Sequence, residues 1–161
     1  MVGGKRPLAS SYSNARGAGA DVLNITASGG IDAAANVPGA LITNVETINI
    51  RAVTSPANTG DNTTFNAINT TGVTSLNSTN STDSVTFTNA PAAASIGMSG
   101  NNAITLGDVN FGYATATTAP VINISGGTKA DTGTDITNTA NGATTATINS
   151  TGEKHAVDVV T

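Results

Sequence analysis

The chain has 161 residues, including 28 Thr, 19 Asn and 18 Gly, but only three Phe, two Tyr and neither Trp nor Cys. This length fits one domain. Burial stabilises a fold by ~25 cal/mol per Å² of apolar surface, so a chain with so few large apolar side chains is unlike an ordinary enzyme with a large core. The lack of Cys excludes disulfides and thiolate metal sites, and six basic residues in a chain of net charge −4 provide no basic stripe for nucleic acid.

The first twenty residues show no apolar periodicity and hold half of the basic side chains, Lys5, Arg6 and Arg16. We expect residues 1–20 to form an arm that is flexible or ordered by a partner, and residues 21–161 to form a repeat domain. A composition rich in Ser, Thr, Asn and Gly is also typical of disorder. Only 10% of the residues are charged, however, and β-branched clusters recur throughout, which favours a folded chain.

From Asp21 onward, short β-branched runs alternate with Gly and Asn, the pattern of strands and corners. The expected strands are 22–26, 45–53, 63–68, 73–76, 84–88, 103–106, 109–113, 121–124, 144–148 and 156–160. Alternation places Ile48 and Ile50 on one face, so each strand should bury one side. No segment keeps a helical period of apolar residues, and none has the ~20 apolar residues of a membrane span.

A motif of an apolar residue, Asn and then Ile or Ser recurs at nearly regular spacing. Its asparagines are Asn24, Asn49, Asn77, Asn123 and Asn149. They are separated by 25, 28, 46 and 26 residues, and Asn101-Asn102 lies near the position of a missing copy in the long interval. The pattern predicts about six units of roughly 25 residues.

A fixed period places like residues over like residues, which favours an all-β fold of parallel solenoid coils. A coil of this length holds three short strands and their corners. The recurring asparagines then stack as a ladder in which each amide donates to one neighbour and accepts from the other, which would satisfy buried amides. A β-sandwich, with strands every 8 to 12 residues, is the alternative fold.

Most aspartates lie at turns beside Gly, Asn or Thr, where carboxylates and backbone carbonyls together suit calcium. Asp61, Asp108, Asp131 and Asp135 are the candidate ligands, although aspartate is also a common turn former. A catalytic triad needs a base and an orienting acid around its nucleophile. The single histidine, His155, lies in a charged turn with no such partners, so we do not expect an enzyme.

Two segments carry a resemblance to a known family. Ile42 to Ile50 (ITNVETINI) and Thr70 to Asn77 (TTGVTSLN) are similar to repeat units of bacterial surface-layer proteins and related large secreted repeat proteins. The similarity extends over most of residues 21–161. It implies a β-solenoid that leaves the cell by one-step export and assembles at the cell surface, often with calcium, into a paracrystalline coat. Adhesins share the same units.

The expected solenoid exposes strand edges at its ends, and such edges pair readily with another chain. The final apolar run contains Val157, Val159 and Val160, which we expect at an assembly contact. Head-to-tail contacts that do not close give a filament. We therefore expect an extracellular structural protein that forms a homo-oligomeric filament or lattice. The alternative is an adhesin-like module for a cell-surface glycan or another surface ligand, but Phe65, Phe87, Phe111 and Tyr113 should point mostly inward.

Overall fold

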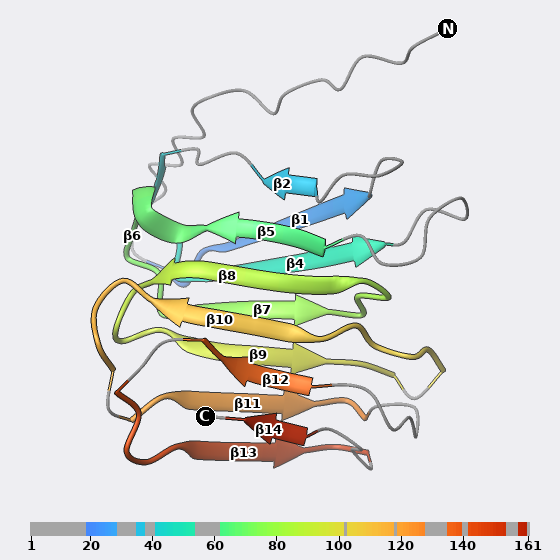
Figure 1. Cartoon of the computed structure of the whole chain (residues 1–161). Helices are drawn as coiled ribbons and strands as arrows, with labels where there is room; N and C mark the ends of the chain where they lie inside the picture. The colour runs from blue at the N-terminus through green and yellow to red at the C-terminus, as the bar shows by residue number, and fades with distance from the viewer. Residues whose placement is uncertain are drawn as a thin grey trace, which may run out of the picture.

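The computed structural model of the chain describes residues 19–28, 35–37, 41–53, 62–101, 103–117, 119–127, 135–139, 142–153 and 158–160. It is a parallel β-solenoid whose coils stack along one axis, with strands of the two main sheets running in opposite directions (Figure 1). Every described strand pair is parallel, because each strand pairs with its equivalent in the next coil. The predicted solenoid is therefore confirmed over the β-sandwich.

Two six-stranded sheets face each other across the core. The first sheet has the order β1 (Val22–Ser28), β4 (Thr47–Val53), β7 (Ser75–Thr79), β9 (Ser95–Ser99), β11 (Val121–Ser125) and β13 (Thr147–Thr151). The second has the order β14 (Asp158–Val160), β12 (Asp135–Asn138), β10 (Val109–Tyr113), β8 (Ser84–Ala90), β5 (Asn62–Asn66) and β2 (Ala35–Val37). A short third sheet pairs β3 (Ile42–Thr43) with β6 (Thr70–Thr71), next to the 3-10 turn η1 (Ala67–Asn69).

Alternation along each strand builds the core from aligned columns. In the first sheet one inward column consists of Ile48, Leu76, Ile96 and Ile122, all fully buried. In the second sheet Phe65, Phe87 and Phe111 are in register and buried, and the first two rings meet edge to face at 6.4 Å between centroids. Three of the few aromatic rings are thus concentrated in one stack inside the solenoid.

The coils differ in length. The ladder positions of neighbouring coils are 25, 28 and 26 residues apart where asparagine is paired with asparagine. The 46-residue interval contains the expected extra coil, but Gly97, and not Asn101-Asn102, lies between Asn77 and Asn123 in the sheet. The placement at Asn101 was wrong because the coil from Ser75 to Ser95 has only 20 residues. It connects β7, β8 and β9 without an equivalent of η1 and β6.

Several predicted strands differ from those observed. The strand predicted at 103–106 is not formed, because residues 103–104 form a bend and residues 105–106 have no regular structure. β9 and β12 were not predicted. β9 was missed because its sequence, Ser-Ile-Gly-Met-Ser, has a glycine at its centre and little β-branching. β13 begins at Thr147 and not at residue 144. Within the described residues, no helix is long and apolar enough to cross a membrane.

Candidate functional site

The recurring asparagines form hydrogen-bonded ladders on the first sheet. Asn49 Nδ2 donates to Asn24 Oδ1, and Asn77 Nδ2 donates to Asn49 Oδ1, each at 2.9 Å. Asn149 Nδ2 donates to Asn123 Oδ1, also at 2.9 Å. In each of these three bonds the amide of the later coil donates to the amide oxygen of the earlier coil, so the ladder has a direction.

The ladder lies on the outward face of the sheet, so the expectation that it satisfies buried amides was wrong. Asn49 stands between Ile48 and Ile50, which are fully buried, and alternation therefore turns its amide toward solvent. Rows of hydroxyl-bearing side chains flank the ladder at the C-terminal ends of the strands, with Thr79, Ser99 and Ser125 in register. Amides and hydroxyls therefore dominate the outward face of this sheet.

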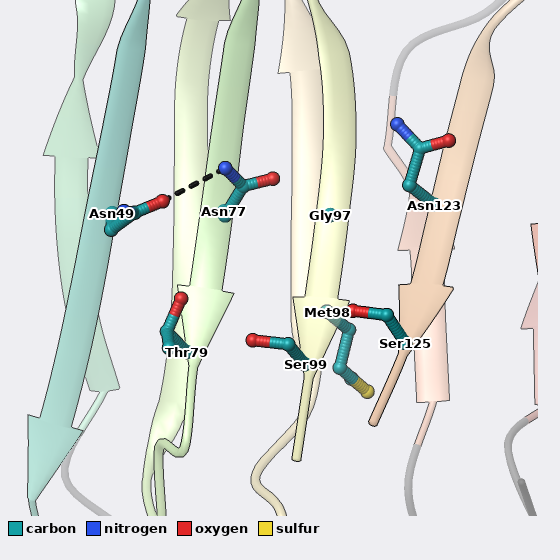
Figure 2. Close-up of a pocket in the computed structure, with 8 residues that line it drawn as sticks. All are labelled: Asn49, Asn77, Thr79, Gly97, Met98, Ser99, Asn123 and Ser125. Atoms are coloured by element: carbon teal, nitrogen blue, oxygen red, sulfur yellow. Dashed lines mark hydrogen bonds between the residues drawn. The ribbon is translucent and has the colours of Figure 1, made fainter. Parts of the chain in front are cut away.

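Gly97 interrupts the ladder between Asn77 and Asn123. Figure 2 shows Asn77 Oδ1 and Asn123 Nδ2 on the two sides of this position, without a bond between them. A Cβ built on Gly97 would overlap Asn77 Oδ1, because the Asn77 amide leans over the glycine, where it accepts a bond from Ser75 Oγ at 3.1 Å. The interruption forms part of a groove of about 310 Å³ lined by ladder amides and by the hydroxyls of Thr79, Ser99 and Ser125.

Gly97→Asn should close this gap and raise the free energy of unfolding by ~1 kcal/mol. The new amide can form one hydrogen bond with Asn77 and one with Asn123, each of ~0.5–1.5 kcal/mol, and these bonds more than offset the displacement of the Asn77 amide. That amide is a side-chain end and can rotate, unlike a backbone obstacle. Urea denaturation measures the change. Gly97→Ala is the control, since it adds the Cβ without the amide and should not stabilise. Equal stabilisation by both variants would contradict the ladder explanation.

The two ends of the ladder carry complementary groups. Asn24 accepts through Oδ1, and its Nδ2 has no partner among the residues that the structure describes. Asn149 donates through Nδ2, and its Oδ1 likewise has no partner in the described part of the chain. One end of the solenoid therefore presents an amide donor, and the other presents an amide acceptor.

These ends coincide with the edge strands. β1 and β13 form opposite edges of the first sheet, and β2 and β14 form the corresponding edges of the second. At the C-terminal end Ile148 continues the buried column of Ile122 but is 50% exposed. The core is thus open to solvent where β13 ends the sheet.

The predicted calcium ligands are only partly placed. Asp61 and Asp131 lie outside the described residues, as does His155. Asp108 stands directly before β10, and its Oδ1 accepts a bond from the backbone N–H of Asp135 at 3.0 Å. Asp135 is in register with Asp158, which the sequence analysis did not select. The three acids follow one another in an aspartate column on the second sheet, although the described residues contain no group of three or more acidic, His or Cys side chains arranged to hold a metal ion.

The predicted assembly valines lie at the edge strand β14. Val157 is outside the described residues, Val159 is half-buried and packs against the core, and Val160 ends the strand. Tyr113 is also part of the core: its hydroxyl donates to the carbonyl of Ala94 at 3.1 Å, and burial raises its pKa. It is therefore a neutral structural donor.

A comparison with known proteins finds no matching family model, no similar curated protein and no similar solved structure. The functional argument therefore depends on the geometry of this chain.

Proposed function

We propose that this protein is a structural subunit that assembles through the edges of its β-sheets into an extracellular filament or surface layer. One observation carries the proposal: among the described residues the strands at both ends of the solenoid have one unpaired edge, with an amide donor at one end and an amide acceptor at the other. Unpaired edges are ready templates for a further strand. The role is structural and involves no catalytic step.

The outer surface supports a location outside the cell, as the resemblance of ITNVETINI and TTGVTSLN to surface-layer repeat units implies. The described outward faces carry mainly Thr, Ser and Asn, with Arg51 as the one basic side chain on the first sheet of the described residues. Such a surface has few charges to hold copies apart. In a cell-surface coat this favours close lateral contact between neighbouring solenoids.

An adhesin-like role is the second candidate, and the groove at Gly97 favours it. Its amides and hydroxyls can bond the hydroxyls of a glycan. The aromatic rings that commonly stack on sugars are absent from this groove, because Phe65, Phe87 and Phe111 are buried in the core. Among its lining residues Met98 is apolar but none is aromatic, so the groove lacks a stacking surface for a sugar ring. The structural role is therefore the better supported of the two.

Calcium is part of the proposal as an assembly cation. Neighbouring parallel strands lie ~4.8 Å apart, so the in-register acids Asp108, Asp135 and Asp158 concentrate negative charge along one line. Like charges that face each other on a sheet are destabilising, and a divalent cation relieves the repulsion. Calcium bound loosely along this column would favour the folded and assembled state.

Negative-stain electron microscopy of the purified chain tests self-assembly. We expect ordered filaments or sheets in calcium and fewer in chelator. Ile148→Lys should abolish them, because it places a charge at the open end of the core, whereas Val121→Lys, on an interior strand, should not. Circular dichroism verifies that both variants fold. Monodisperse monomers of the unchanged chain in both solutions would contradict assembly, and equal assembly in chelator would remove calcium from the proposal.

A further inference from the structure

We propose that copies of this chain stack head to tail in one defined register, with β13 of one copy pairing in parallel with β1 of the next. The asparagine ladder then continues across the boundary, as Asn24 of the incoming copy donates its free amide to Asn149 of the copy before it. This inference rests on the proposed self-assembly and specifies its contact.

The direction of the ladder fixes the polarity of the contact. In each bonded pair within the chain the later asparagine donates to the earlier one. Asn24 is therefore left with a donor, and Asn149 with an acceptor. A two-fold contact between two β1 edges would oppose donor to donor, would run antiparallel, and would end growth at a dimer. A donor end on an acceptor end instead gives a heterologous contact that can repeat without limit.

The columns of the sheet fix the register. Thr147, Ile148 and Asn149 are in register with Val121, Ile122 and Asn123 in the preceding coil. At the other edge Val22, Leu23 and Asn24 are in register with Thr47, Ile48 and Asn49. Continuing the same columns places Val22 over Thr147, Leu23 over Ile148 and Asn24 over Asn149.

Slipped registers lose these contacts. A shift of one residue would place the Asn24 amide on the core side, opposite Ile148, because side chains alternate with a period of two. A shift of two residues would again turn the Asn24 amide to the outward face, but it would lie opposite Thr147 or Thr151 and not opposite Asn149. The unshifted register alone covers Ile148, which is 50% exposed, with an apolar residue and also bonds both amides.

The second sheet is compatible with the same stack. Its order ends with β14 beside the C-terminal coil and with β2 beside the N-terminal coil. Figure 1 shows β13 and β14 together at the bottom of the solenoid, and β1 and β2 together near the top. Stacking therefore brings both pairs of open edges together in one contact.

Cysteine cross-linking tests the register, because the chain has no cysteine of its own. Val22 (55% exposed) and Thr147 are exposed outward positions at opposite edges. Val22→Cys chains mixed with Thr147→Cys chains under mild oxidation should form a disulfide, because register neighbours meet the Cα separation of ~4.4–6.8 Å that a disulfide needs. Thr151→Cys is the matched control, since it lies four residues away, ~13 Å along the strand. We expect roughly tenfold or more product with Thr147→Cys, in line with the narrow geometric limits of the bond.

Asn24→Asp tests the amide contact. It keeps an oxygen that accepts from Asn49 but replaces the free donor with a second acceptor, facing Asn149 Oδ1. We expect folding to be retained and the critical concentration for assembly to rise roughly tenfold, which corresponds to ~1.4 kcal/mol. Light scattering against concentration measures this shift.

The outcomes separate the two proposals. Filaments whose Val22→Cys chains cross-link to one another, or that favour Thr151→Cys over Thr147→Cys, would overturn the register and leave self-assembly standing. Filaments unaffected by Asn24→Asp would overturn the continuous ladder. If the unchanged chain does not assemble and no pair cross-links, both the inference and the proposed function fail.

Discussion

Phe87→Ala is expected to lower the free energy of unfolding by ~3–5 kcal/mol, the range for removing a buried ring from a core. Phe87 is fully buried on β8, in register between Phe65 and Phe111, and its ring meets that of Phe65 edge to face. Truncation would remove the middle ring of the stack. Because neighbouring coils hold the adjacent rings in place, the cavity cannot collapse easily. Urea denaturation followed by circular dichroism measures the loss.

Two variants control for this effect. Phe87→Leu keeps most of the apolar volume and should cost clearly less than the alanine variant. Thr86→Ala changes the neighbouring outward side chain on the same strand and should stay within ~0.5 kcal/mol, as surface substitutions do. A loss below ~1.5 kcal/mol for Phe87→Ala would mean that the stack tolerates a gap, contrary to the close packing expected of an interior.

The sequence predicted the solenoid because its signal is local and repeated. Alternation around Asn49 and the period of its motif both follow from positions along one strand, and they fix which residues face inward and which lie over one another. The strand at 109–113 was predicted with its observed bounds. The composition predicted a core with few aromatic rings, and the structure places three of these rings in one column.

The sequence could not place features that depend on how coils are paired. Gly97 occupies a ladder position, but no asparagine marks it, and a coil of 20 residues departs from the average period. The alignment of Asp108, Asp135 and Asp158 likewise follows only from the register of three coils. Such columns cannot be recognised from the spacing of residues in the sequence, because the loops at the corners differ in length from coil to coil.

Glycines with similar apparent crowding should respond differently to substitution. At Gly97 a new Cβ meets the end of a side chain, which can rotate away. At Gly107 it would overlap the backbone carbonyl of Asp83 and come within 2.6 Å of Ser84 N, both in the adjacent coil. These atoms belong to the turn that leads into β8, and Gly107 N donates to the carbonyl of Ser81 at 3.1 Å. An added Cβ at Gly107 can therefore be accommodated only if the two coils move apart.

Gly107→Ala is accordingly expected to lower the free energy of unfolding by ~3 kcal/mol or more, at or above the upper end of overpacking costs, because backbone must move. Thermal and urea denaturation measure the loss. Gly19→Ala is the matched control, since nothing lies within 4 Å of its added Cβ, and it should be nearly neutral. A nearly neutral Gly107→Ala would show that adjacent coils can part at this corner at little cost, and the tight stacking inferred for β8 and β10 would then be wrong.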